Sequence, residues 1–181
     1  MFAKPQKTFG SPFKARRTLA ALLLIFSFST TAFASSLDDA PTSGTVGLGL
    51  NYPGLGVRYF LTDQYSLEAK AQIEKDTSVG GLRAYRYFSA ISGILPFAGL
   101  EADYISFKGD GVKGSGFAGS AFLGGEFFFA RSFSAQFDFG PSYIQLKDKK
   151  SSLSVSGIEY VMNIGLNYYF GGDSDSRSYV K

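Results

Sequence analysis

The feature that most constrains the fold is a strict alternation of side chains over residues 157–170. Every second position from Ile158 to Phe170 is large and apolar or aromatic, whereas most positions between them are small or polar. Successive side chains of a β-strand point to opposite faces of the sheet, so a period of two predicts a strand with two chemically different faces. The segment is long for a strand of a water-soluble protein, and it matches the length of a tilted strand that crosses a bilayer.

The first 34 residues have the pattern of an export signal. Five basic residues and no acid precede an apolar run from Leu19 to Phe28, and small residues follow at Ala32 and Ala34. This order is typical of a secretory signal peptide, here residues 1–34, with cleavage expected after Ala34. The apolar run is too short for a membrane anchor. The surroundings of the Arg16-Arg17 pair fit twin-arginine export poorly, which favours general secretion.

Removal of the signal changes the charge of the chain. The full sequence has 18 Lys and Arg against 15 Asp and Glu; five of the basic residues leave with the signal, so 13 remain and the net charge becomes −2. The basic isoelectric point of the precursor therefore gives no reason to expect a nucleic-acid partner. The chain has no cysteine and no histidine, which excludes disulfides, thiol chemistry and a histidine base. We expect neither a cofactor nor a metal site.

The same alternation recurs along the rest of the chain. It predicts eight strands, over residues 45–52, 55–62, 66–74, 80–88, 96–107, 116–130, 133–146 and 157–170. Turns and loops without helical periodicity join them, which predicts an antiparallel meander. A loose polar lead-in at 35–43 precedes the strands, and a polar tail at 171–181 follows them. In 80–88 the register is ambiguous, and we expect Tyr85 and Tyr87 on the apolar face with Arg86 behind them. Pro141 and a slip after Tyr143 suggest a β-bulge.

The apolar face is expected to point outward. Eight strands enclose a space that side chains just fill, and the apolar set, with about ten Phe and Tyr and a dozen aliphatic residues, is too bulky for it. The opposite face is rich in glycine, at positions 47, 49, 56, 99, 116, 124, 140, 157 and 165. Lipid cannot satisfy a free strand edge, so the first strand must pair with the last. The predicted fold is all-β: a closed antiparallel eight-stranded up-and-down transmembrane β-barrel over residues 44–170. A secreted, lipocalin-like ligand carrier, with its apolar face inside, is the alternative.

The orientation follows from closure. Both termini and the turns at 62–65, 89–95 and 131–132 are expected on the periplasmic side, with the loops at 53–54, 75–79, 108–115 and 147–153 outside the cell. The expected aromatic girdles are Tyr52, Tyr104, Tyr143 and Tyr160 at the outer interface and Phe129, Phe133, Tyr168 and Phe170 at the inner one. The outward loops carry lysines that could contact lipopolysaccharide phosphates, namely Lys108, Lys113, Lys147, Lys149 and Lys150; a merely solvated charged loop is the alternative.

Charged residues on the polar face are expected to fill the barrel. The predicted set consists of Arg58, Glu68, Lys70, Arg86, Glu101, Asp103, Glu126, Asp138 and Glu159. Buried charges must be paired, because an unpaired one is strongly destabilising. We therefore expect a network of ion pairs that plugs the lumen. A narrow porin-like path for small solutes or ions is the alternative.

With this pattern in place, the chain resembles the small eight-stranded outer-membrane barrels of Gram-negative bacteria, of the OmpX and opacity-protein type. The sharpest motif is Asn163-x-Gly165-x-x-Tyr168-x-Phe170, which is similar to the terminal-strand signal of that family. The resemblance implies residence in the outer membrane and contact with the barrel assembly machinery during insertion. Family members usually stop at the final aromatic residue, whereas this chain continues to Lys181.

The function expected from these patterns is structural or interactive, and not enzymatic. Small barrels of this fold that cleave lipids or peptides rely on a histidine, which this chain lacks. Glu101 and Asp103 could serve as an acid/base pair, but no nucleophile or substrate cleft accompanies them. The expected partners are outer-membrane lipids and lipopolysaccharide, and we expect a monomer.

Overall fold

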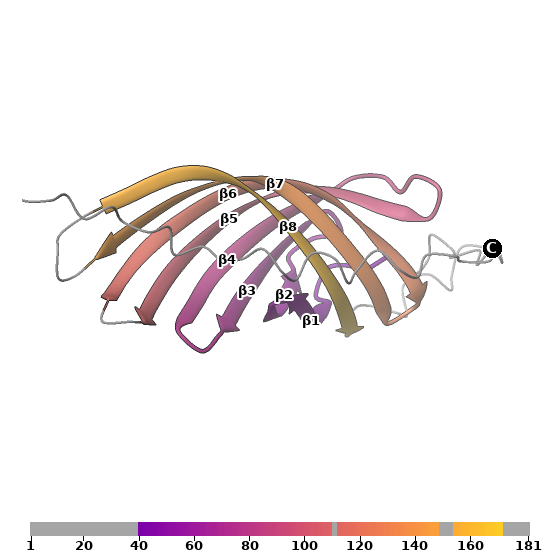
Figure 1. Ribbon diagram of the computed structural model, residues 1–181. Coiled ribbons are helices and arrows are strands. Elements are labelled where there is room, and N and C mark those ends of the chain that lie inside the picture. Colours follow the sequence, from indigo (N-terminus) through magenta and orange to yellow (C-terminus); the bar gives the residue numbers. More distant parts are fainter. Residues whose placement is uncertain (1–39, 110–111, 149–153, 172–181) are drawn as a thin grey trace, which may run out of the picture. The chain divides into compact units, whose positions relative to one another are not determined.

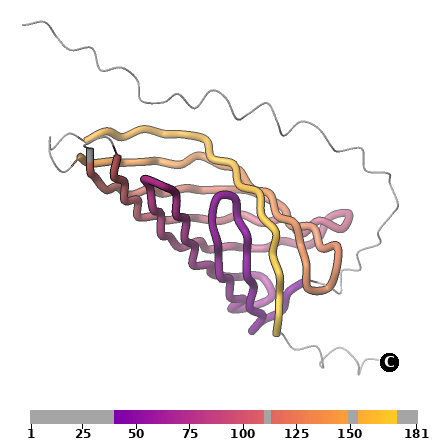
Figure 2. Tube along the Cα trace, turned by 60° about the horizontal axis from the view of Figure 1, so that its bottom comes forward, coloured from indigo at the N-terminus to yellow at the C-terminus, as the bar shows by residue number. Residues whose placement is uncertain are grey.

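The alternating segments form eight antiparallel strands that close into a barrel (Figure 1). The structure is a computed structural model that describes residues 40–109, 112–148 and 154–171. The strands are β1 (Val46–Tyr52), β2 (Gly54–Phe60), β3 (Tyr65–Ile73), β4 (Thr77–Tyr87), β5 (Ile94–Gly109), β6 (Val112–Ala130), β7 (Phe133–Asp148) and β8 (Ser154–Phe170). Each strand pairs with the next, and β8 returns to β1, beside which it runs in Figure 2. The predicted closed, up-and-down, eight-stranded fold is confirmed.

Most of the predicted segments before and after the barrel lie outside the residues that the structure describes. The predicted signal peptide at 1–34, Lys149 and Lys150, and all of the predicted tail except Gly171 lie outside the described residues. Within the described ranges, no helix is long and apolar enough to cross a membrane. Residues 40–43 are not the loose lead-in that was expected. Ser43 donates a hydrogen bond from Oγ to the carbonyl of Leu61 at 3.0 Å, and Pro41 is buried.

The apolar face of the sheet points away from the barrel, as predicted. Phe137, Leu166 and Tyr168 are 44%, 53% and 42% exposed, whereas Glu126 and Asp138 are fully buried. A lipocalin-like carrier requires the reverse arrangement, so the structure contradicts that alternative. The reason is steric, because the glycines of the inner face leave room for the side chains that fill the lumen, whereas the continuous rows of bulky residues on the other face would not fit there.

The register predicted for β4 is wrong. Tyr85 and Tyr87 point into the barrel, together with Arg83, and Arg86 lies on the outer face. Either register leaves one arginine outside. The cost of an arginine on the lipid face of a barrel is highest at mid-membrane and small near the interface. Arg83 is near the middle of the strand and Arg86 is one residue from its end, so the observed register hides the more costly charge.

The strands differ in length, and this limits where the barrel is closed. β1 and β2 have 7 residues each, whereas β5 to β8 have 16 to 19. The β1–β8 seam runs from Val46 opposite Phe170 to Tyr52 opposite Ile164. The part of β8 from Ser154 to Asn163 pairs with β7 only. Beyond the seam β8 has one open edge, and its residues from Ser154 to Met162 are exposed on both faces.

This open extension explains a second correction. Glu159 falls on the inward register of β8, as predicted, but it lies beyond the seam and is exposed. The predicted bulge near Pro141 is also absent from the β7–β8 ladder, which runs without a shift from Phe133 to Lys147. The irregularity is instead between Phe128 and Ala130, where β6 meets β7.

The lumen at the end where β8 terminates is filled by aromatic rings. The cluster consists of Phe60, Tyr85, Tyr87, Phe97, Phe122, Phe128 and Tyr169, all buried. They meet in edge-on and stacked contacts, such as Tyr85 against Phe97, with ring centroids 5.4 Å apart. Glycines on neighbouring strands make room for these rings: Gly99 on β5 is paired with Phe122 on β6, and a Cβ at Gly99 would collide with the ring of Phe122 and the carbonyl of Ala84. The plug is therefore partly aromatic, whereas the sequence predicted a charged one.

Candidate functional site: a charged network inside the barrel

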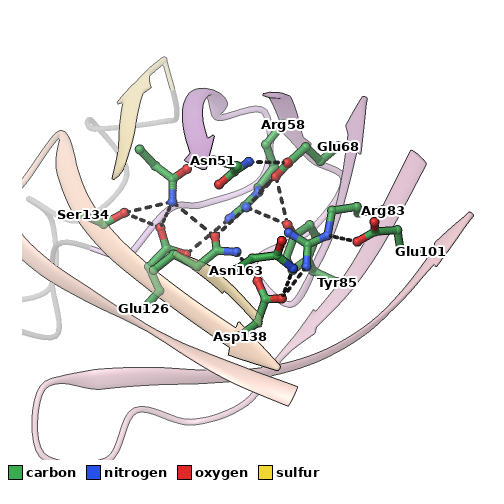
Figure 3. A network of polar contacts seen from close by, with 12 residues as sticks. Asn51, Arg58, Glu68, Arg83, Tyr85, Glu101, Glu126, Ser134, Asp138 and Asn163 are labelled. Carbon is green, nitrogen blue, oxygen red and sulfur yellow. Dashed lines mark hydrogen bonds and ion pairs between the residues drawn. The ribbon is translucent and has the colours of Figure 1, made fainter. Parts of the chain in front are cut away.

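Arg58 on β2 is the centre of the polar interior (Figure 3). Its Nε and Nη2 donate to Oε2 of Glu68 at 2.8 and 2.5 Å, and its Nη1 lies 3.3 Å from Oε2 of Glu126. Further hydrogen bonds run to the hydroxyls of Tyr85, Tyr87 and Tyr169 and to the side-chain oxygen of Gln136. A guanidinium group has five N–H donors in a fixed fork, and here the fork contacts side chains from five different strands.

Glu126 on β6 is a second carboxylate beside Arg58 and accepts several hydrogen bonds. In addition to that arginine, it accepts hydrogen bonds from Tyr87 at 2.9 Å and from Asn167 at 3.0 Å, and from the hydroxyls of Ser134 and Tyr169. Its side chain is fully buried. A buried carboxylate is tolerated when its lone pairs are occupied and a cation is close. Both conditions are met, so this end of the lumen is closed by a fully bonded cluster.

A second buried arginine, Arg83 on β4, forms ion pairs with two further carboxylates. Its Nη2 donates to Oδ1 of Asp138 at 2.8 Å, and its Nε lies 2.8 Å from Oε2 of Glu101. Tyr85 lies between the two arginines, with the Cζ atoms of Arg58 and Arg83 at 4.0 and 5.1 Å from its ring centroid. Cation–π contacts of this kind favour a desolvated guanidinium. The ring therefore separates two like charges and interacts favourably with each.

Lys70 on β3 ends the network on the side of the long strands. It forms ion pairs with Glu101 and with Asp103, the latter at 3.1 Å. Its side chain is 18% exposed, against 2% or less for Arg58 and Arg83. The solvent exposure of the network therefore increases from Arg58 towards Lys70. Among the described residues its ion pairs join three cations to five carboxylates, so the excess charge is negative.

The structure places most of the predicted lumen residues together. Arg58, Glu68, Lys70, Glu101, Asp103, Glu126 and Asp138 are joined by ion pairs on the inner face. Arg86 and Glu159 are not part of this network, for the reasons given above. Arg83 was missed, because the register chosen for residues 80–88 put it outside. One signal could have found it: Arg83 lies directly opposite Glu68 on one side and Glu101 on the other, and opposite charges across a ladder stabilise a sheet.

The chemistry available to this network is limited. Each carboxylate that was a candidate acid or base contacts a cation, and Glu101 and Asp103 share Lys70. In the described parts of the chain, no group of three or more acidic side chains has a geometry that could hold a metal ion. What the arrangement does is occupy the barrel interior and connect β2, β3, β4, β5, β6 and β7 across it.

The residues of the predicted assembly motif divide between the two faces of β8. Asn163 donates to Asp138 at 2.8 Å, and Gly165 leaves room for the side chain of Asn51. Tyr168 and Phe170 lie outside with their ring centroids 6.2 Å apart. Contacts between neighbouring rings also join Phe129 to Phe133 and Phe133 to Tyr168. Four outward aromatics thus form a continuous strip near the chain's C-terminal end.

The described lysines of the opposite end are exposed and close to one another. Lys108 on β5 and Lys113 on β6 are direct cross-strand partners, and Lys147 on β7 pairs with Ser115. All three side chains are exposed. Like charges directly opposite each other destabilise a sheet, and Lys108 and Lys113 are such a pair.

Comparison with known proteins gives similarity to solved structures but no family. No family model and no curated protein matches the sequence. A solved structure with a similar course of the chain is the N-terminal β-barrel domain of OprF from Pseudomonas aeruginosa, with 15% sequence identity and a TM-score of 0.45; the match covers 70% of this chain and 94% of that one. This likeness is too weak to bear on function. The resemblance to the OmpX and opacity-protein type stays a prediction.

Proposed function

We propose that the chain is an integral outer-membrane barrel with a structural or interactive role, a plugged lumen and no catalytic activity. The observation that carries this proposal is the pairing of an exposed apolar outer face with the buried ion pairs of Arg58 and Arg83 inside the barrel. In water, such an outer face would be an aggregation liability; in lipid, it is the favourable surface. The aromatic strip of Phe129, Phe133, Tyr168 and Phe170 near one end of the barrel fits a membrane interface.

The plug has a direct electrical test. The aromatic cluster and the Arg58 network occupy the lumen in successive layers, so an open water path is not expected. Purified protein, refolded into a planar bilayer, should give no long-lived conductance steps above the bare membrane. Migration that changes on heating in a denaturing gel should establish, for the same sample, that the barrel is folded. Stable steps of uniform size from a folded sample would contradict the plug and favour the porin-like alternative, with cation selectivity from the excess carboxylates.

A second candidate role is contact with lipopolysaccharide. The observation that favours it is the direct opposition of Lys108 and Lys113, with Lys147 on the neighbouring strand, at the end of the barrel proposed to face outward. Phosphate groups would remove the repulsion between these cations. Lys149 and Lys150, in the adjoining loop, are part of the same proposal on sequence grounds alone.

Removal of these charges should weaken lipopolysaccharide binding. A variant with Lys108, Lys113 and Lys147 all replaced by alanine is expected to lose about tenfold or more in affinity, because even one hydrogen bond from a charged donor to phosphate, about 1.5–3 kcal/mol, corresponds to that loss. Binding of the refolded protein to immobilised lipopolysaccharide measures the change. Arg131→Ala, in the exposed turn between β6 and β7 at the other end of the barrel, is the control. Equal affinity of the triple variant and the control would leave these lysines as a solvated surface only.

A further inference from the structure

A shallow groove crosses the outer surface of the barrel from β3 to β8. It encloses about 630 Å³, within the range of about 300–1,000 Å³ typical of sites that hold small ligands. Its lining includes three outward-facing alanines, Ala84, Ala98 and Ala121. Larger side chains surround them, among them Leu123 and Phe139. The groove is thus a strip of small side chains bordered by bulky apolar residues, and it is one of several such grooves on the outer face.

One end of the groove carries a cation. Arg86 lines it beside its cross-strand neighbour Tyr65, and its Cζ lies 5.4 Å from the ring centroid of Phe88. Within the described part of the chain Arg86 has no carboxylate at ion-pair distance, and its side chain is exposed. It is therefore a guanidinium on an apolar surface, held by one aromatic ring and with its N–H donors free. Arginine so placed suits a phosphate, which it can bind through two parallel hydrogen bonds.

The groove leads from this cation towards the middle of the apolar band. The cross-strand pairs can be followed around the barrel from one strand to the next. The series that starts at Val46 on β1 includes Ala84 on β4 and ends at Tyr160 on β8. At the seam, however, Val46 pairs with Phe170, which is ten residues further along β8. From β1 towards β8, each series of paired residues therefore moves away from the end of the barrel at which β8 terminates. Arg86 lies at the end of the groove closer to the terminus of β8, and Tyr160 lies at the end farther from it. A molecule with an anionic head at Arg86 would extend its tail away from that interface.

We propose that this groove is a binding site for one phospholipid of the periplasmic leaflet. Its phosphate binds Arg86 and one acyl chain lies over Ala84, Ala98 and Ala121. The proposal rests on the proposed function, because it requires the outer face to contact lipid and the end bearing Arg86 to lie at the periplasmic interface. The occupant follows from charge complementarity at one end of the groove and from the apolar lining along its length. It also gives a role to the one basic residue that the β4 register leaves on this part of the outer face.

Native mass spectrometry of the refolded, delipidated protein tests the proposal. With phosphatidylglycerol added to the detergent, wild-type protein is expected to retain one lipid preferentially. Arg86→Gln should reduce the retained fraction about tenfold, because the lipid phosphate loses a charged partner that can donate two parallel hydrogen bonds. Diacylglycerol, which has the chains without phosphate, and inorganic phosphate, which has no chains, should both bind much more weakly than phosphatidylglycerol.

Two alanine variants separate the groove from the surface in general. Ala84→Leu fills the groove and should reduce lipid retention while Arg86 remains. Ala69→Leu makes the same change on the outer face of β3, outside this groove, and should leave retention unchanged. Equal retention by wild type, Arg86→Gln and Ala84→Leu would overturn the proposal, as would equal binding of diacylglycerol and phosphatidylglycerol.

Failure of this inference is distinguishable from failure of the proposed function. Insertion into vesicles and heat-modifiable migration report on the membrane barrel itself, and the lipid variants should leave both unchanged. A barrel that inserts but retains no lipid contradicts the groove alone. A chain that does not insert contradicts the membrane assignment and the lipid site together.

Discussion

Replacement of Arg58 by methionine is expected to destabilise the folded barrel by about 3–5 kcal/mol, because removal of one partner leaves a buried charge uncompensated. Arg58 is the cation that contacts both Glu68 and Glu126, and all three side chains are buried. Methionine fills much of the space, so the loss would come from the charge and not from a cavity. Urea titration of protein refolded into lipid vesicles, followed by far-ultraviolet circular dichroism, measures the free energy of unfolding; the chain has no tryptophan for fluorescence.

A second substitution assigns the loss to the ion pair. Adding Glu68→Gln to Arg58→Met removes the stranded carboxylate while it keeps the acceptor for Asn51. Contacting residues typically show a coupling of about 0.5–3 kcal/mol, so the double variant should be more stable than Arg58→Met alone. Lys75→Met, in an exposed turn, is the control and should change stability by no more than about 0.5 kcal/mol. A loss at Arg58 as small as that of the control would show that the interior is not organised by this residue.

An arginine in place of Leu82 is expected to cost about 2–4 kcal/mol in a bilayer, the penalty for a cation on the lipid face at mid-membrane. Leu82 is near the middle of β4 and is 65% exposed. If that face meets acyl chains, the guanidinium loses its hydration there. If the face meets water, the substitution at an exposed strand position should cost little. The measurement is the same urea titration in vesicles, which makes this variant a test of the membrane assignment.

The control for Leu82→Arg is the same substitution at a position closer to the proposed membrane interface. Leu61 is 50% exposed and follows the end of β2, at the level of the proposed periplasmic interface. Leu61→Arg makes the same chemical change where the expected penalty falls to about 0–1 kcal/mol. A clear difference between the two variants supports a lipid-covered band. Equal and small effects at Leu82 and Leu61 would contradict the proposal that the barrel spans a membrane.

The charged interior shows where reasoning from the sequence is sound and where it fails. Glu68, Glu101, Glu126 and Asp138 were assigned to the lumen from alternation alone, and the structure joins them in ion pairs there. Arg83 was missed because residues 80–88 alternate tyrosine and arginine without a distinctly apolar side. Which of two arginines is hidden depends on their depth in the barrel, and depth is set by the stagger of neighbouring strands.

Glu159 illustrates the same limit for burial. Its register on β8 was predicted, but register gives only the direction of a side chain. Whether an inward side chain is covered depends on how far the neighbouring strands extend. Among the described residues the β1–β8 ladder ends at Tyr52 opposite Ile164, so Glu159 has no partner on β1 and is exposed. The aromatic part of the plug was also unforeseen, because it needs glycines such as Gly99 on one strand to face rings such as Phe122 on the next.

The sequence by itself determined the number of strands, their antiparallel order and the outward direction of the apolar face. These follow from a period of two, from the turns between segments and from side-chain bulk, all of which are local properties of the chain. Only the tertiary structure decided which arginine of β4 is buried, where the β1–β8 seam ends and which carboxylates share a cation. Those outcomes depend on how far each strand is shifted against its neighbours, and the shift is fixed only when the barrel closes.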